Sequence, residues 1–206
     1  MELTLGADVY YAEGLYGRLT HIVLNPKLRW VTHLVVKEKG QKQRERILSV
    51  KYIEQATPKE IHLICTKEAA SHFQPFEVSR YVHTPTLGAD ISVFWSIDRQ
   101  AEHYFPSDGT YIPIKTRAIP LCEVAVNQDV RVEATNGMIG RLRGFQVNPL
   151  GWKITHLILH KGHIWSQEEV AIPTADIESI GEKILQLKLD KKGIKSMNRR
   201  LSKQGI

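Results

Sequence analysis

The side chains best suited to chemistry in this chain are its nine histidines. His156, His160 and His163 stand closest together, and the first two would share one face of a strand. Neutral imidazoles bind zinc, yet no Asp, Glu or Cys lies between His156 and His163 to complete a catalytic zinc shell. We therefore expect packing and turn roles here and no metal site. An enzyme with a histidine-based metal site stays as an alternative, which stoichiometric zinc in the purified protein would support.

Two histidines, His33 and His156, occupy matching positions between branched apolar residues. This setting is typical of a half-buried histidine that is hydrogen-bonded to the backbone. The sequence also lacks the common catalytic motifs: the Gly-x-x-x-x-Gly-Lys phosphate loop, Gly-x-Gly-x-x-Gly, Gly-x-Ser-x-Gly and His-Glu-x-x-His. We predict a protein that is not an enzyme, with no catalytic residue and no cofactor.

Aromatic residues concentrate in the segment 74–120, which also contains five prolines. Five of the aromatic residues are candidates for contacting a partner protein: Phe94, Trp95, Tyr104, Phe105 and Tyr111. A flexible linker has a different composition. Such rings either pack as a clamp against neighbouring domains or line an exposed binding surface. Mutation of Trp95 or Phe105 separates these alternatives, because a clamp loses stability whereas a binding surface loses its partner.

The net charge of +6 comes from the C-terminal residues, because residues 1–187 are formally neutral. Six basic residues there are candidates for binding an anion: Lys191, Lys192, Lys195, Arg199, Arg200 and Lys203. Apolar residues at helical spacing predict a short helix that docks on its own domain, with an anionic membrane surface and RNA as alternatives. An RNA- or ribosome-associated function would give salt-dependent RNA binding that is lost on deletion of residues 191–206.

An internal repeat indicates which elements position these residues. Four short motifs occur twice in the same order: Asp8-Val9 and Asp129-Val130, Gly17-Arg18-Leu19 and Gly140-Arg141-Leu142, Asn25-Pro26 and Asn148-Pro149, Thr32-His33-Leu34 and Thr155-His156-Leu157. The last three pairs share one offset of 123 residues. A constant offset of this kind indicates a duplication.

Each copy has the pattern of short strands separated by turns. Residues 18–24 and 30–37 would form a hairpin around Asn25-Pro26, and residues 141–147 and 152–160 would form another. Further strands are predicted at 47–49 and 61–64 in the first copy, and at 170–173 and 184–187 in the second. Without helical periodicity between them, these strands favour a small antiparallel barrel over an α/β fold.

The order of the motifs resembles that of the PRC-barrel family. The first copy follows it with Gly6-Ala7-Asp8-Val9, Gly17-Arg18-Leu19, Asn25-Pro26 and Thr32-His33-Leu34-Val35-Val36. The second resembles a bacterial subset through Gly162-His163-Ile164-Trp165 and Val170-Ala171-Ile172-Pro173. The first copy has Ser49 where the family prefers proline, and the second opens at Asn127 without the glycine.

The resemblance, over about residues 5–66 and 124–190, implies protein-interaction modules. Related barrels form the cytoplasmic part of the photosynthetic reaction-centre H subunit and the C-terminal domain of RimM-type ribosome maturation factors, where they are not catalytic. We therefore expect an all-β chain with two small antiparallel PRC-type β-barrels in tandem. Their predicted bounds are 1–73 and 121–206, with the aromatic connector at 74–120 and a short C-terminal helix.

The expected function is that of an adaptor whose partner is another protein, with homo-oligomerisation left open. The chain begins without the pattern of a signal peptide and has no uncharged apolar run of about 18 residues. We predict a cytoplasmic protein without a transmembrane segment. Its two cysteines, Cys65 and Cys122, should then be reduced.

Overall fold

The computed structural model describes residues 1–40, 44–84, 110–161 and 169–194. The chain divides into two compact units: residues 1–76 together with 118–206 form the first, and Glu77–Arg117 form the second. The second unit is an insertion between two parts of the chain that fold together. The connector predicted from sequence, 74–120, begins and ends close to this insertion.

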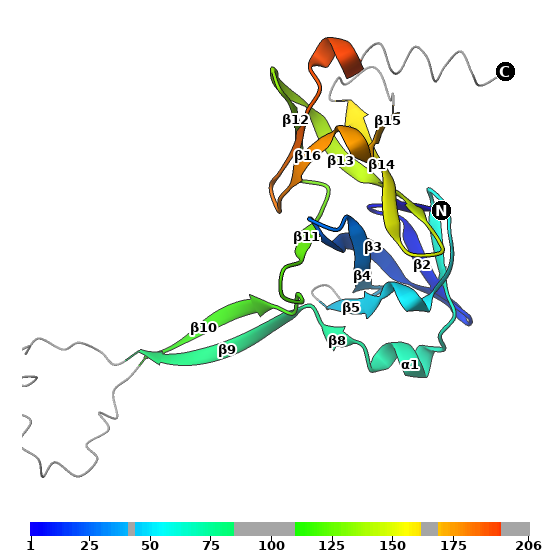
Figure 1. The fold of residues 1–206 in the computed structure, drawn as a ribbon. Coiled ribbons are helices and arrows are strands. Elements are labelled where there is room, and N and C mark those ends of the chain that lie inside the picture. The colour runs from blue at the N-terminus through cyan, green and yellow to red at the C-terminus, as the bar shows by residue number, and fades with distance from the viewer. Residues whose placement is uncertain (41–43, 85–109, 162–168, 195–206) are drawn as a thin grey trace, which may run out of the picture. The chain divides into compact units, whose positions relative to one another are not determined.

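Strands make up most of the first repeat, residues 1–76 (Figure 1). They are β1 (Glu2–Thr4), β2 (Asp8–Tyr11), β3 (Gly14–Asn25), β4 (Trp30–Glu38), β5 (Glu45–Ser49), β6 (Ile53–Ala56), β7 (Glu60–Leu63) and β8 (Gln74–Pro75), with a 3-10 turn η1 (Val50–Tyr52) and helix α1 (Lys67–Ser71). Asn25 ends β3, since its side-chain oxygen accepts hydrogen bonds from the backbone N–H groups of Lys27 and Leu28. Such an Asx turn explains why Asn-Pro separates the two strands of the hairpin.

The second repeat has the same order of elements. Its strands are β11 (Val124–Val126), β12 (Arg131–Ala134), β13 (Gly137–Asn148), β14 (Lys153–Lys161), β15 (Glu169–Pro173), β16 (Ile177–Ile180) and β17 (Ile184–Leu187), with a 3-10 turn η3 (Thr174–Asp176). β13 and β14 follow β3 and β4 by 123 residues, and β15 to β17 follow β5 to β7 by 124. Pairing also matches, because β2 with β7 and β12 with β17 are both parallel.

Each repeat begins with a strand that pairs with the other repeat. β1 runs antiparallel to β13, with Leu3 opposite Phe145. β11 runs antiparallel to β3, with Val126 opposite Ile22 (Figure 1). Val126 follows Leu3 by 123 residues and Phe145 follows Ile22 by the same number, so the exchange is reciprocal. The strands of this unit thereby belong to one curled sheet. The sequence analysis did not predict this exchange.

The two repeats also meet where β4 lies beside β14. Val31 donates its N–H to the carbonyl of Trp152, and Ile154 donates to the carbonyl of Arg29, both at 2.9 Å. The guanidinium of Arg29 donates in addition to the carbonyls of Thr174 and Ile177 in the second repeat. The contact therefore combines backbone pairing with one charged side chain that reaches across.

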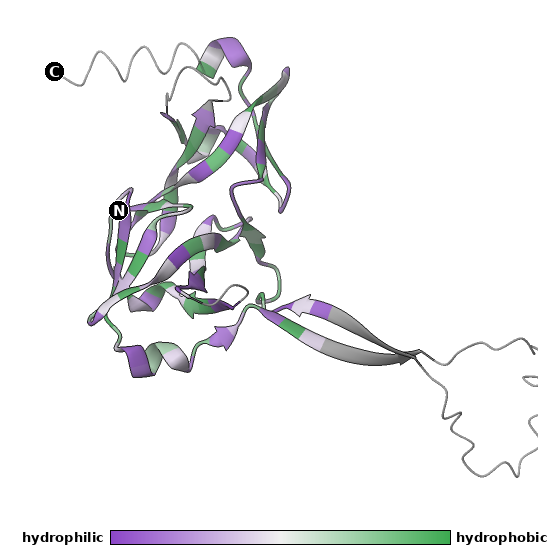
Figure 2. Ribbon diagram, turned by 180° about the vertical axis from the view of Figure 1, so that it is seen from behind, coloured by the Kyte–Doolittle hydropathy of each residue, from purple (hydrophilic) through white to green (hydrophobic). Residues whose placement is uncertain are grey.

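A single apolar core extends through both repeats, and it contains fully buried side chains such as Leu34 and Leu157. A second, smaller cluster lies on the opposite face of β3 and β4 and contains Val23, Val35, Ile47, Phe76 and Ala125. Figure 2 shows the alternation of hydrophobic and hydrophilic residues along the strands. Both faces of β4 therefore pack in apolar clusters: Leu34 lies in the shared core, and Val35 lies in the smaller cluster with Phe76.

The second unit is a hairpin of β9 (Glu77–Thr84) and β10 (Thr110–Arg117). The two strands are antiparallel, with Glu77 opposite Arg117 and Thr84 opposite Thr110. Within the described part of the chain they pair only with each other.

The prediction of an all-β chain is confirmed. Helical structure in the described ranges is short: α1 covers Lys67–Ser71, and one turn covers residues 191–194. None of these described helices has the length and apolar character required to cross a membrane.

Candidate functional site

Of the five aromatic residues predicted to contact a partner, one lies on the described hairpin of the second unit. Phe94, Trp95, Tyr104 and Phe105 fall within residues 85–109, outside the described residues, whereas Tyr111 lies on β10 opposite His83. The pairing of Thr84 with Thr110 brings the two ends of the segment 85–109 together. Binding by these residues, and the choice between a clamp and an exposed surface, stay predictions.

Of the six basic residues predicted to bind an anion, Lys191 and Lys192 lie in the described part of the chain, and both are exposed. Lys195, Arg199, Arg200 and Lys203 lie outside it. Asp190 accepts a hydrogen bond from the N–H of Gly193 at 2.7 Å, and Ile194 is buried in the core shared by the repeats. The start of the predicted helix therefore docks on its own unit, while anion binding stays a prediction.

A groove of about 520 Å³ lies beside β5 on the first repeat. Its wall is formed by residues of four segments: His33 on β4, residues from β5 to η1, the chain after α1, and the residues that follow the insertion. These are His33, Ile47, Leu48, Ser49, Tyr52, His72, Phe73, Gln74, Ala118, Ile119 and Pro120. None of them is Asp, Glu, Lys or Arg, so this groove, called here the β5 groove, suits an uncharged ligand.

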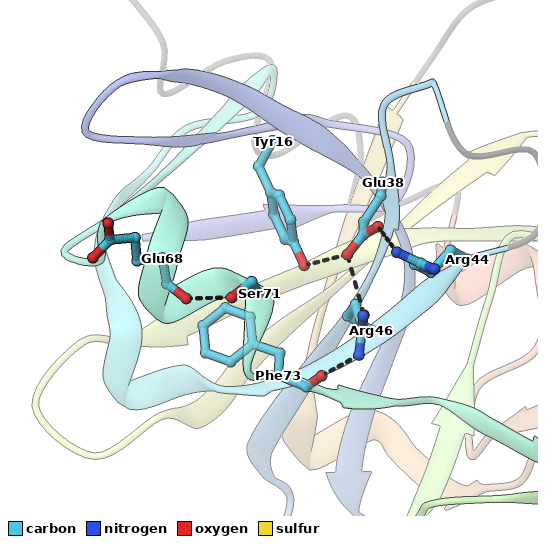
Figure 3. Close-up of polar contacts among 7 residues, drawn as sticks. All are labelled: Tyr16, Glu38, Arg44, Arg46, Glu68, Ser71 and Phe73. Atoms are coloured by element: carbon cyan, nitrogen blue, oxygen red, sulfur yellow. Dashed lines mark hydrogen bonds and ion pairs between the residues drawn. The ribbon is translucent and has the colours of Figure 1, made fainter.

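A half-buried ionic cluster contacts one wall of the β5 groove; Figure 3 shows its side chains. The carboxylate of Glu38 accepts hydrogen bonds from Arg46 Nε at 3.1 Å and from the Tyr16 hydroxyl at 3.5 Å. Arg46 also donates through Nη1 to the carbonyl of Phe73 at 2.6 Å. Phe73 then packs its ring against those of Tyr52 and Tyr16, with centroids 5.0 and 6.4 Å apart.

The electrostatics of this cluster keep Tyr16 protonated. Burial raises the pKa of the Tyr16 phenol, and the neighbouring carboxylate of Glu38 raises it further. A neutral phenol can donate to Glu38, so the two groups satisfy each other. No local pattern in the sequence predicts this cluster, because its members come from β3, β4 and β5 and only the strand pairing brings them together.

A second polar group supports the groove at His33. Its Nδ1 lies 3.0 Å from the hydroxyl of Thr32, which donates to Glu123 Oε2 at 2.5 Å. The second repeat has the same geometry without a carboxylate, since His156 Nδ1 lies 3.2 Å from the hydroxyl of Thr155. Both histidines are half-buried, as predicted, but their hydrogen-bonding neighbour is the preceding threonine hydroxyl and not the backbone.

A larger cavity of about 720 Å³ lies between the start of β2 and the segment 127–129. Arg18 and Arg143 line it, as do Asp8 and Asp129. Arg18 lies 3.3 Å from Asp8, and Asp129 lies 3.4 Å from Arg141. Arg143 Nε lies 3.4 Å from Glu169. Arg143 Nε is buried and makes no hydrogen bond among the described residues, and Lys59 adds a further charge to the lining. The cavity is thus lined by charges of both signs, and the β5 groove is the better candidate for an uncharged ligand.

Histidine and cysteine side chains are the usual ligands of zinc. In the described part of the chain, no group of three or more His, Cys, Asp or Glu side chains is placed to hold a metal ion. His156 and His160 both lie on β14, and His163 lies outside the described residues. Both cysteines are free thiols, and burial raises the pKa of Cys65.

The sequence matches no protein-family model, and no curated protein is significantly similar to it. The resemblance to PRC-barrels therefore depends on the motifs of the chain itself.

Proposed function

We propose that this chain is a non-catalytic adaptor in which two PRC-type β-barrels support an inserted hairpin that binds a partner protein through its aromatic segment. The observation that carries the proposal is the insertion itself. The described strands of residues 77–117 pair only with each other, and the chain leaves and re-enters the first unit at adjacent points. At those points Ala118 donates its N–H to the carbonyl of Phe76 at 2.8 Å.

The assignment of PRC-type barrels is supported by the repeated motifs and by the matching strand order of the two repeats. The Asp-Val and Gly-Arg-Leu motifs have the same physical role in both copies, because Arg18 approaches Asp8 and Arg141 approaches Asp129. The Asn-Pro motifs also act alike, since Asn25 and Asn148 both cap their turns by accepting backbone hydrogen bonds. Equivalent motifs thus make equivalent contacts.

Physical reasons favour binding by the hairpin. A two-stranded ribbon buries little surface by itself and is marginally stable unless it packs on something. Aromatic side chains contribute most of the binding energy at many protein interfaces. Pairing the ends of the aromatic segment reduces the conformational freedom that a partner would have to restrict, and this lowers the entropic cost of binding.

The test is to replace residues 85–109 by Asn-Gly. Thr84 and Thr110 are directly paired, so a two-residue type I′ turn should close the ribbon. We expect the shortened protein to unfold at the same temperature as the parent, within about 3 °C. Affinity capture from a lysate of the source organism, with mass spectrometry, should lose the proteins that the parent chain retains.

Two substitutions serve as controls for this test. Trp95→Ala with Phe105→Ala should reproduce the loss of capture at unchanged chain length. Trp30→Ala removes an exposed aromatic side chain of the first unit and should leave capture unchanged. Unaltered capture by the shortened protein would disprove the proposal, and a large loss of thermal stability would favour the clamp instead.

A further inference from the structure

The outer edge of β5, on the side away from β4, is paired with β8 along only part of its length. The β5 groove lies along the rest of that edge. β5 pairs with β4 along one side, whereas β8 pairs with it only at Arg46 and Ile47 on the other. Leu48 and Ser49 extend beyond β8, and both line the groove. The groove therefore begins where β8 ends.

The backbone of Ser49 faces this open edge. Residues of an antiparallel strand alternate between bonding to one neighbour and bonding to the other. The carbonyl of Glu45 accepts a hydrogen bond from the N–H of Phe76 at 2.9 Å, so the backbone of Glu45 points away from β4. Because the direction alternates along β5, Ile47 and Ser49 point the same way. Among the described residues, the N–H of Ser49 has no hydrogen-bond acceptor. Its hydroxyl accepts from the N–H of Lys51, and its carbonyl belongs to η1, of which Ser49 is the N-cap.

The N–H of Ser49 in the first repeat has no equivalent in the second repeat. Pro173 corresponds to Ser49 and has nearly the same backbone, with φ −57° and ψ 144° against φ −69° and ψ 143°. Proline has no N–H to offer at a sheet edge. The wall formed by Ala118, Ile119 and Pro120 lines only the groove of the first repeat, because these residues directly follow the insertion.

We propose that the β5 groove binds a short, uncharged, apolar segment of a partner protein, which continues the sheet edge by accepting a hydrogen bond from the backbone N–H of Ser49. β8 is the precedent within the chain, since it adds to the same edge and buries Phe76 completely against the first repeat. Backbone bonds at a sheet edge supply affinity, and pockets for alternate side chains supply specificity. The volume of about 520 Å³ falls in the range of ligand sites. This site is separate from the aromatic hairpin.

The probe is a displayed library of random seven-residue peptides, selected against the full chain. We expect enrichment of peptides with Ile, Val, Phe or Pro and without charge at their centre. A selected peptide should bind Ser49→Pro at least about tenfold more weakly than the parent chain, because the substitution removes the donor. Ser49→Ala, which keeps the N–H, should bind within about twofold of the parent.

The substitution to proline is compatible with folding, because φ at Ser49 is −69° and proline occupies the matching position in the second repeat. A measurement on the parent chain gives an independent test. The amide proton of Ser49 should exchange rapidly with solvent in the free protein and slowly when the peptide is bound. The chain with residues 85–109 replaced by Asn-Gly should bind the same peptides, which separates this site from the proposed function of the hairpin.

Three outcomes would overturn the inference. One is that no peptide is enriched over an unrelated control protein. Another is equal affinity for the parent and Ser49→Pro, or an Ser49 amide that the peptide leaves unprotected. The third is a dimer of the parent chain that Ser49→Pro dissociates, because the groove would then hold a second copy of the chain.

Discussion

Arg46 connects three parts of the first repeat through one guanidinium group. It bonds to Glu38 on β4 and to the carbonyl of Phe73 after α1, and it stands on β5. The side chains of Arg46 and Glu38 are only 18% and 15% exposed. When one partner of such a poorly hydrated ion pair is removed, the other charge is left without compensation from either its partner or water. The loss of one partner is therefore strongly destabilising.

We predict that Arg46→Ala lowers the free energy of unfolding by about 3 kcal/mol, since it leaves the Glu38 carboxylate and the Phe73 carbonyl without their donor. Urea denaturation measures the effect. Arg44→Ala is the matched control: its side chain is 55% exposed and lies 3.9 Å from Glu38, so the loss should stay below about 1 kcal/mol. Equal losses for the two variants would contradict the interpretation of Arg46 as the central residue.

Strand β1 shows what a single element contributes. Its approach to β13 requires a glycine, because a Cβ atom at Gly144 would lie 2.2 Å from the carbonyl oxygen of Leu3. The backbone atoms of β1 cannot yield as a flexible side chain would. Leu3 itself is fully buried opposite Phe145, so displacement of β1 would open the core that the two repeats share.

We expect Gly144→Ala to destabilise the protein by about 2–3 kcal/mol, as overpacking at a fixed backbone does. Thermal unfolding and urea denaturation both report the change. Gly151→Ala provides the comparison: a Cβ there meets nothing within 4 Å, and the free energy of unfolding should change by less than about 0.5 kcal/mol. A neutral Gly144→Ala would mean that β1 is not held against β13 in solution.

At the scale of the whole molecule, the exchange of β1 and β11 makes the first unit one folding body. Each repeat supplies a strand to the sheet of the other, and the apolar core runs through both. A repeat separated from its partner would expose the edge of β3 or β13 together with the apolar face beneath it. Exposed edges and apolar faces of this kind promote association.

The reciprocal exchange of β1 and β11 predicts that the two repeats are stable only together. Residues 1–76 and 118–206, produced as two chains in the same cell, should purify as a stable one-to-one complex, because all the pairing between the repeats survives the removal of 77–117. Size-exclusion chromatography with light scattering measures the stoichiometry. Each fragment produced alone should aggregate or self-associate. Two independently folded, monomeric fragments would disprove the reciprocal exchange.

The amino-acid sequence by itself determined the duplication, four strands of each copy and the Asn-Pro turn of each hairpin. Local properties suffice for these features: the alternation of apolar residues along a strand, the capping side chains of Asn25 and Asn148, and the constant offset between the copies. The tertiary structure alone decided the exchange of β1 and β11, the cluster at Glu38 and the open edge at Ser49. Each of these depends on the register between strands distant in the chain, and a shift of one residue would move every side chain to the opposite face.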